Sequence, residues 1–346
     1  MRLELERRTL RLAEPLETSF GPLTERELVI LSLTGEDGVT GYGEAAPLEP
    51  YDGVPLARVL EALERYARLA AAGGEIDGAQ LLDACRDAAD EPAALAAVDL
   101  ALWDRAGRRA GRPVATLMCE QPLREVRVNA TLSAGDRAGA AEQAARAVAA
   151  GYSCVKLKVG MGDDAGRVAA VRAAAGAQTA LRLDANGAWS PEEAVRWIET
   201  LSPAGLELVE EPVHGLAAVR SVRERVAVRV AIDETAAEAG ALASGAADAV
   251  CLKISRCGGI SGLLAAAALV RASGSEPYLA STLDGPLGIA AGVQAAAALA
   301  SRGPLPHCGL ATLELFEGLR NPLPVRAGAI ALPDAPGLGV EPLWES

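Results

Sequence analysis

From about residue 121 onward, short apolar segments alternate with alanine-rich segments, and this alternation limits the fold more than any other feature. The apolar segments are predicted strands: residues 126–132, 154–159, 180–184, 206–210, 228–233, 249–254 and 277–281, with a weaker one near 307–310. The predicted helices between them are residues 138–150, 165–175, 191–201, 236–244, 261–272 and 288–300. Strands and helices that alternate at intervals of roughly 20 to 28 residues predict a closed parallel barrel of the α/β class. A rival open sheet would need a glycine-rich turn after its first strand, where residues 132–136 offer a single glycine.

Residues 1 to about 120 lack this alternation and predict a separate α+β unit. Its predicted strands are residues 27–33 and 39–44, and its predicted helices are residues 56–72 and 92–107. Two loops with glycine and proline, residues 18–24 and 46–54, are candidate mobile segments. The residues after about 321 are rich in proline and glycine and are predicted to return to the first domain. We therefore predict a first domain of residues 1–120 with the return 321–346, and a barrel of residues 121–320.

Composition excludes several classes of protein. A net charge of −13 argues against a nucleic acid or an anionic membrane as partner. The six cysteines are scattered, with no CxxC and no Cys/His ligand spacing, so we expect free thiols. The start of the chain, residues 1–8, reads as a charged strand rather than a signal peptide, and the longest apolar run, near 286–300, is too short to span a membrane. We expect a soluble cytoplasmic protein.

Lysine is rare in this chain and is placed selectively. Of 33 lysines and arginines only three are lysine, namely Lys156, Lys158 and Lys253. Lys156 and Lys158 lie two apart in a predicted strand, so both side chains leave the same face. Arginine stays protonated in proteins, whereas a desolvated lysine can act as a base. The three lysines are therefore the positions where we expect chemistry.

Three carboxylates occupy the ends of successive predicted strands: Asp184, Glu210 and Asp233. In a parallel barrel, active groups lie at the carboxyl ends of strands that are about 4.8 Å apart. These carboxylates would repel one another unless a divalent cation bound them, and an all-oxygen ligand set suits Mg²⁺ or Mn²⁺. A strand-end carboxylate alone is usually a cap or a solvated group. Six such positions on five successive strands, lysines included, favour a site that removes a proton α to a carboxylate.

This arrangement resembles the enolase superfamily, in particular its muconate-lactonizing-enzyme subgroup. The resemblance covers nearly the whole chain, including Gly-Tyr-Gly-Glu-Ala at residues 41–45 and the segment 99–104. It implies a modified TIM barrel, (β/α)7β, with an N-terminal α+β capping domain. It also implies that Lys158 is the base, Lys156 its electrostatic partner and Lys253 the lysine on the opposite face.

The resemblance further implies that Asp184, Glu210 and Asp233 hold Mg²⁺. Two cap loops, near Phe20 and near Tyr51, would close over a small-molecule carboxylate substrate. Weaker candidate contacts are Ser281 and Thr282, which could bind a second substrate carboxylate, and Arg26, which could reach over the site. Assembly into a homo-oligomer is left open.

The reaction within the subgroup is predicted from the last two strand ends. Residues 280–289 and 308–315 look like those of o-succinylbenzoate synthases, lyases of menaquinone biosynthesis that dehydrate a cyclohexadiene hydroxy acid (SHCHC). The alternatives are an N-acylamino acid racemase or dipeptide epimerase, and a muconate cycloisomerase. Dipeptide epimerases usually carry Asp-x-Asp after strand eight, which is absent here, whereas residues 315–318 are similar to the cycloisomerases.

Two further classes are less favoured. The branch that resembles mandelate racemase needs a His/Asp base on later strands, and the chain has only His214 and His307. We interpret both as loop residues. A barrel that binds a ligand without catalysis is the alternative of a different class, and the complete set of six strand-end residues argues against it.

Overall fold

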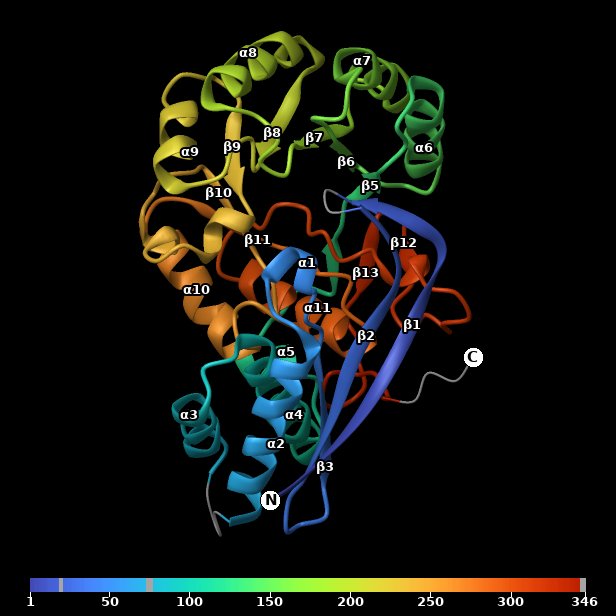
Figure 1. Ribbon diagram of the computed structural model, residues 1–346. Helices are drawn as coiled ribbons and strands as arrows, with labels where there is room; N and C mark the ends of the chain where they lie inside the picture. Colours follow the sequence, from blue (N-terminus) through green and yellow to red (C-terminus); the bar gives the residue numbers. More distant parts are fainter. Residues whose placement is uncertain (19–20, 73–76, 343–346) are drawn as a thin grey trace.

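The computed structural model describes residues 1–18, 21–72 and 77–342 (Figure 1). The N-terminal part begins with an antiparallel sheet in the order β1-β2-β3, formed by β1 (Arg2–Thr18), β2 (Gly21–Thr34) and β3 (Thr40–Ala45). Its helices are α1 (Glu49–Asp52), α2 (Leu56–Ala72), α3 (Gly78–Ala88), α4 (Pro92–Ala110) and α5 (Val114–Met118). The predicted hairpin strands and both predicted helices are therefore present, the predicted charged strand of residues 1–8 is the first part of β1, and α1, α3 and α5 are additional.

The two glycines of β3 allow close packing of this strand on α4. A Cβ atom at Gly41 would overlap the carbonyl oxygen of Ala101, and one at Gly43 would overlap that of Ala97. Both neighbours are helix backbone, which cannot move aside as a flexible side chain can. The two glycines of this Gly-x-Gly pattern therefore allow the backbones of β3 and α4 to approach closely.

The barrel strands follow the predicted alternation closely. They are β5 (Ala130–Leu132), β6 (Cys154–Lys158), β7 (Ala180–Asp184), β8 (Leu206–Glu210), β9 (Arg229–Ile232), β10 (Ala249–Leu252) and β11 (Glu276–Leu279). All neighbours are parallel, in the order β11-β10-β9-β8-β7-β6-β5. Figure 1 shows α6 to α9 as an arc of helices outside these strands.

The barrel closes through a minimal eighth strand. The predicted segment near 307–310 forms two isolated parallel bridges, Cys308 with Val128 and Gly309 with Ala280. These bridges join the end of β11 to the segment before β5, so the predicted (β/α)7β barrel is confirmed. The predicted strand 126–132 is divided: β4 (Glu125–Arg127) leaves the barrel sheet and pairs antiparallel with β13 (Ala329–Ala331), which also pairs with β12 (Val325–Arg326).

The helices of the barrel are mostly those predicted from sequence. They are α6 (Arg137–Ala149), α7 (Asp164–Ala175), α8 (Pro191–Leu201), α9 (Leu216–Arg223), α10 (Ile260–Ala272) and α11 (Pro286–Ala300), with short 3₁₀ turns η1 (Ser202–Ala204) and η4 (Leu313–Leu315). The predicted helix 236–244 is wrong. It is replaced by two 3₁₀ turns, η2 (Glu234–Ala237) and η3 (Ala241–Ala243), because Gly240 between them is left-handed with φ 81°. Helix α9, which begins after Gly215, was not predicted.

The last described residues return to the cap. Gly337 O accepts a hydrogen bond of 2.9 Å from Val114 N, and Leu338 N donates one of 2.7 Å to Asp104 Oδ1. The buried Asp104 also accepts from Tyr42 N on β3, at 2.9 Å. One carboxylate in α4 thereby ties β3 to the C-terminal segment. The division of the chain into domains at residue 120 stays a prediction.

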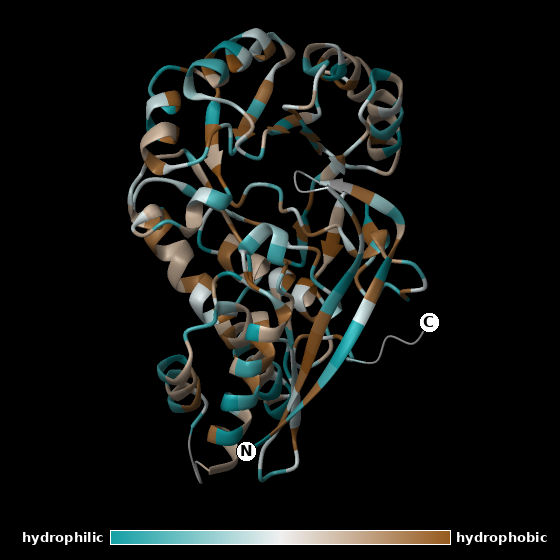
Figure 2. Ribbon diagram, in the orientation of Figure 1, coloured by the Kyte–Doolittle hydropathy of each residue, from teal (hydrophilic) through white to brown (hydrophobic). Residues whose placement is uncertain are grey.

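Hydrophobic burial forms two main cores. The larger one fills the barrel and surrounds α11, which is buried along nearly its whole length. The second lies between β2, α2, α3 and α4 of the cap, and Figure 2 shows hydrophobic residues gathered along β2. Within the described residues, none of the helices combines the length and the apolar character needed to cross a membrane.

Candidate active site

The carboxyl ends of three neighbouring strands place Lys156, Asp184 and Glu210 in direct contact. Asp184 and Glu210 are register partners on β7 and β8, as parallel strands require. Lys156 Nζ lies 3.0 Å from Asp184 Oδ2 and 3.1 Å from Glu210 Oε1. The carboxylate side chains are only 3% and 1% exposed, so these ion pairs are buried.

The charges of this group strongly influence one another. Burial alone would lower the pKa of Lys156, but the carboxylates of Asp184 and Glu210 raise it well above its usual value. Burial raises the pKa of Glu210, and the nearby charges of Asp184 and Asp233 add to that effect. Lys156 is therefore held as a cation between two carboxylates, a state that suits an electrostatic role.

Asp233 and Lys253 form a second buried ion pair directly after β9 and β10. Lys253 Nζ is 2.7 Å from Asp233 Oδ2. Tyr51, from α1 of the cap, reaches this pair: its hydroxyl donates to Asp233 Oδ1 at 2.8 Å and accepts from Lys253 Nζ at 2.6 Å. The ammonium also lies 4.0 Å from the centroid of the Tyr51 ring, a cation–π distance. The structure thus places Tyr51 inside the candidate site.

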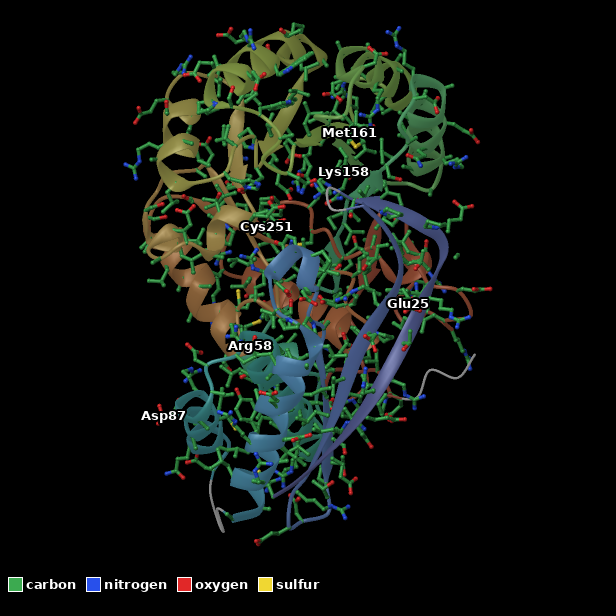
Figure 3. All side chains as sticks on the ribbon, in the orientation of Figure 1. Glu25, Arg58, Asp87, Lys158, Met161 and Cys251 are labelled. Carbon is green, nitrogen blue, oxygen red and sulfur yellow. The ribbon has the colours of Figure 1, made fainter. Side chains whose placement is uncertain are left out.

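Lys158 differs from the other two lysines in its partners. Its Nζ donates to the side-chain oxygen of Asn186 at 2.9 Å, and over the chain the structure describes it forms no ion pair. Asn186 is itself oriented by Glu234, whose Oε1 accepts from Asn186 Nδ2 at 3.0 Å. Figure 3 labels Lys158 and Cys251, which lie between the barrel helices and the cap. Among the described residues, Lys156 and Lys253 each pair with a carboxylate and Lys158 does not.

The carboxylates meet the requirements of a divalent-cation site. Ligand atoms of Glu210, Asp233 and Cys251 lie within 4.8 Å of one another. Glu210 Oε2 is buried and makes no hydrogen bond with any residue that the structure describes, which is unfavourable for a carboxylate unless a cation binds it. Asp184 lies outside that group of three; its Oδ2 contacts Lys156 and its Oδ1 accepts from Asn186 N at 3.1 Å. The donor set present therefore fits a bound cation.

Glu211, the residue after Glu210, positions Asp233. Its Oε2 accepts a 2.7 Å hydrogen bond from Asp233 N, and its Oε1 accepts one of 3.0 Å from Thr235 N. His214 Nδ1 lies 3.0 Å from the same Oε1, on the loop where we predicted a loop residue. Glu211 is therefore a buried anchor for the turn that carries Asp233.

The weaker candidates make hydrogen bonds within the protein. Ser281 Oγ lies 3.0 Å from Thr312 Oγ1, and Thr282 Oγ1 donates to Asp284 Oδ1 at 2.8 Å. Arg26 is buried and donates to the carbonyl oxygens of residues 46, 47 and 283. Phe20 lies outside the described residues. Contacts of these four residues with a substrate stay predictions.

Sequence reasoning missed several residues of this site, among them Cys251 and Arg256. Cys251 lies two before Lys253 on the β10 segment, so it faces the same interior side, and burial raises the pKa of its thiol. Arg256 follows in the turn after β10, and its Nη1 donates to the Tyr51 hydroxyl at 2.6 Å. The period of two along the strand could have found Cys251. Arg256 depends on the fold of a loop and had no such signal.

Comparisons with known families agree with this architecture. A family model described as "Mandelate racemase / muconate lactonizing enzyme, N-terminal domain" matches residues 3–119, and one described as "Enolase C-terminal domain-like" matches residues 139–346. A parallel barrel under an antiparallel cap, with these matches, defines an enzyme of the enolase superfamily. Within it, the chain belongs to the muconate-lactonizing-enzyme subgroup, as its resemblance predicted.

Individual relatives have different activities. Muconate cycloisomerase 1 of Rhodococcus opacus is 32% identical, over 95% of this chain and 92% of its own. The o-succinylbenzoate synthase of Thermobifida fusca is 39% identical, over 57% of this chain and 62% of its own. A dipeptide epimerase of Enterococcus faecalis, solved with Mg and the dipeptide L-Leu-L-Tyr, superimposes with a TM-score of 0.89 at 28% identity, covering 98% of each chain.

Proposed function

We propose that this protein removes the proton α to a carboxylate and that its reaction is that of o-succinylbenzoate synthase, the dehydration of SHCHC to o-succinylbenzoate in menaquinone biosynthesis. The observation that carries the proposal is the unequal setting of the two lysines that would flank the substrate. Among the described residues Lys158 Nζ hydrogen-bonds the neutral amide of Asn186 and forms no ion pair, whereas Lys253 is paired with Asp233 and covered by Tyr51.

This inequality supports a reaction with one base. A racemase or epimerase needs two groups that exchange a proton on opposite faces, so both must be able to lose their charge. Lys253 is held as a cation by a buried carboxylate 2.7 Å away. A fixed cation can face a developing anion, but it is poorly suited to accept a proton. The syn elimination catalysed by o-succinylbenzoate synthases needs only the base on one face.

Asp184, Glu210 and Asp233 would hold Mg²⁺, and Mn²⁺ has the same preference for oxygen ligands. When bound, the cation would stabilise negative charge that develops on the substrate carboxylate. The Enterococcus relative, described with Mg, supports this choice of metal.

In this reaction Lys158 Nζ takes the α-proton, and Asn186 holds that amine in place. Lys156 adds a fixed positive charge from the same face of β6, two residues earlier. The proton then lies on the side from which hydroxide departs, so Lys158 can return it and water is released. Lys253 stays protonated throughout and faces the anion.

A racemase or epimerase is the second candidate, favoured by the near-complete coverage of the Enterococcus dipeptide epimerase. A muconate cycloisomerase is the third, favoured by the Rhodococcus relative.

The deciding experiment is an ultraviolet assay of purified protein with SHCHC, which follows aromatisation with Mg²⁺ and with chelator. Efficient turnover that requires Mg²⁺ supports the lyase. Lys253→Arg is the matched variant, because arginine keeps the positive charge but cannot act as a base. We expect it to retain dehydration. No turnover of SHCHC, together with α-deuterium uptake into acyl amino acids or dipeptides in D₂O, would overturn the proposal in favour of the second candidate.

A further inference from the structure

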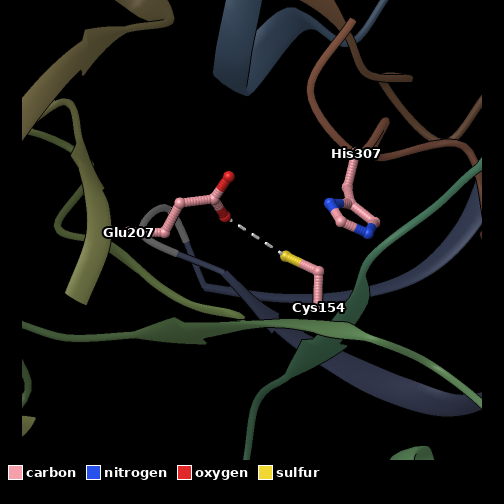
Figure 4. A group of neighbouring side chains, drawn as sticks. All are labelled: Cys154, Glu207 and His307. Carbon is pink, nitrogen blue, oxygen red and sulfur yellow. Dashed lines mark hydrogen bonds between the residues drawn. The ribbon is translucent and has the colours of Figure 1, made fainter. Parts of the chain in front are cut away.

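A cluster of three metal-binding side chains lies at the end of the barrel opposite the lysines. Cys154 begins β6, Glu207 is the second residue of β8, and His307 directly precedes the bridge at Cys308. Figure 4 shows the three side chains pointing toward one another, and one ligand atom from each lies within 4.8 Å of the others. Cys154 Sγ donates to Glu207 Oε2 at 3.7 Å. The proposed function makes no use of this cluster.

Neighbouring groups hold the three side chains in place. His307 Nε2 is 2.9 Å from Ser153 Oγ, and Figure 4 shows the other ring nitrogen on the side of Cys154 and Glu207. A histidine that binds a metal through one nitrogen commonly bonds a polar group through the other. Arg182 binds both carboxylate oxygens of Glu207: its Nε donates to Oε2 at 2.7 Å and its Nη2 donates to Oε1 at 3.1 Å. Its Nη1 donates to the carbonyl oxygen of His307 at 2.7 Å.

We propose that Cys154, Glu207 and His307 bind a divalent transition metal of the Zn²⁺ type, with water as the fourth ligand. One sulfur, one imidazole nitrogen and one carboxylate oxygen are typical zinc ligands, and the sulfur and the imidazole are poor ligands for Mg²⁺. Tetrahedral zinc with bonds of about 2.3 Å to sulfur and about 2.1 Å to oxygen separates those two atoms by about 3.6 Å. Cys154 Sγ and Glu207 Oε2 are already 3.7 Å apart.

Metal binding at this cluster releases one proton from the Cys154 thiol. The cation forms a bond to sulfur as the Cys154 S–H bond breaks, and one proton leaves to solvent. Glu207 keeps its contacts with Arg182, because a carboxylate offers about four lone-pair positions. Its side chain is 27% exposed, so a cation can enter from solvent.

The cluster is separate from the candidate active site. Cys154 and Lys158 are the two ends of β6, and four residues of strand span about 13 Å. A metal bound there would join the starts of β6 and β8 to the segment that closes the barrel through two isolated bridges. We therefore expect it to stabilise the fold rather than to take part in catalysis.

The test is a titration with Co²⁺ as the probe, in excess Mg²⁺, that follows sulfur-to-cobalt charge-transfer absorption in the near ultraviolet. We expect the band in the wild type and in the control variants Cys119→Ser and Cys251→Ser. Cys154→Ser should lose it. Ser153→Ala, which removes only the hydroxyl behind His307, should weaken Zn²⁺ binding by about tenfold in calorimetry.

Circular dichroism establishes that each variant is folded. If Cys154→Ser does not fold, His307→Gln takes its place, and loss of the band there supports the site. Zn²⁺ should also raise the melting temperature of the wild type but not of the variant that lacks the band. A band that persists in Cys154→Ser and His307→Gln, one that disappears only in Cys251→Ser, or no band in any protein would overturn the proposal.

Discussion

Glu44 offers a quantitative test of how the cap and the barrel fit together. It lies on β3, is 3% exposed, and its Oε1 accepts a 2.7 Å hydrogen bond from Gly285 N at the start of α11. Its Oε2 is buried and has no hydrogen-bond partner among the described parts of the chain. Burial, and then the nearby charge of Asp284, raise the pKa of Glu44 from 4.5 to about 8. At neutral pH the folded protein therefore keeps this carboxyl largely protonated.

The raised pKa predicts how stability changes with pH. Between pH 4.5 and about pH 8 the folded state binds the Glu44 proton and the unfolded state releases it, so the free energy of unfolding falls as pH rises. Each pKa unit corresponds to about 1.4 kcal/mol. Integrated from pH 5 to pH 8, Glu44 alone should lower the free energy of unfolding by about 3.5 kcal/mol.

Glu44→Gln isolates this effect, because the amide oxygen can still accept from Gly285 N but the side chain cannot ionise. We expect the free energy of unfolding of the wild type, measured by urea titration, to fall by about 3.5 kcal/mol more than that of this variant between pH 5 and pH 8. Glu61→Gln, an exposed position on α2, is the matched control and should follow the wild type. Parallel pH profiles for the wild type and Glu44→Gln would refute the reasoning.

Three further changes test the site and the fold. Lys158→Ala should reduce turnover by at least about 100-fold with an unchanged circular dichroism spectrum, and retention of more than a few per cent of activity would contradict its role as the base. Asp233→Asn should weaken Mg²⁺ binding in calorimetry, and unchanged affinity would remove it from the ligand set. Gly43→Ala should lower the free energy of unfolding by about 1–3 kcal/mol, because its Cβ would overlap Ala97 O. Gly135→Ala, which meets no atom within 4 Å, is its control, and equal effects of the two would refute the packing argument.

The barrel was largely predictable because each of its strands and helices is marked by a short, continuous sequence pattern. Apolar runs locate β7 and β8 at their observed bounds, and a charged residue ending such a run faces the site. The predictions failed where a glycine changes the backbone conformation and where residues far apart in the sequence come into contact. Gly240 breaks a segment whose composition is otherwise helical. Cys154, Glu207 and His307 come together only through the closure of the barrel, which no spacing rule for metal ligands describes.

The C-terminal return has a consequence for how substrate can enter. The chain crosses between cap and barrel twice: once before β4, and again after β13, whose partner is β4 and whose continuation reaches Asp104 in α4. Two covalent connections, rather than one, restrict how freely the cap can swing relative to the barrel. We expect substrate access to involve local rearrangement of the short turn that carries Tyr51, which is held to the barrel by its hydroxyl contacts with Asp233, Lys253 and Arg256. Release of these hydrogen bonds of the Tyr51 hydroxyl would open the site from the cap side without moving the rest of the cap.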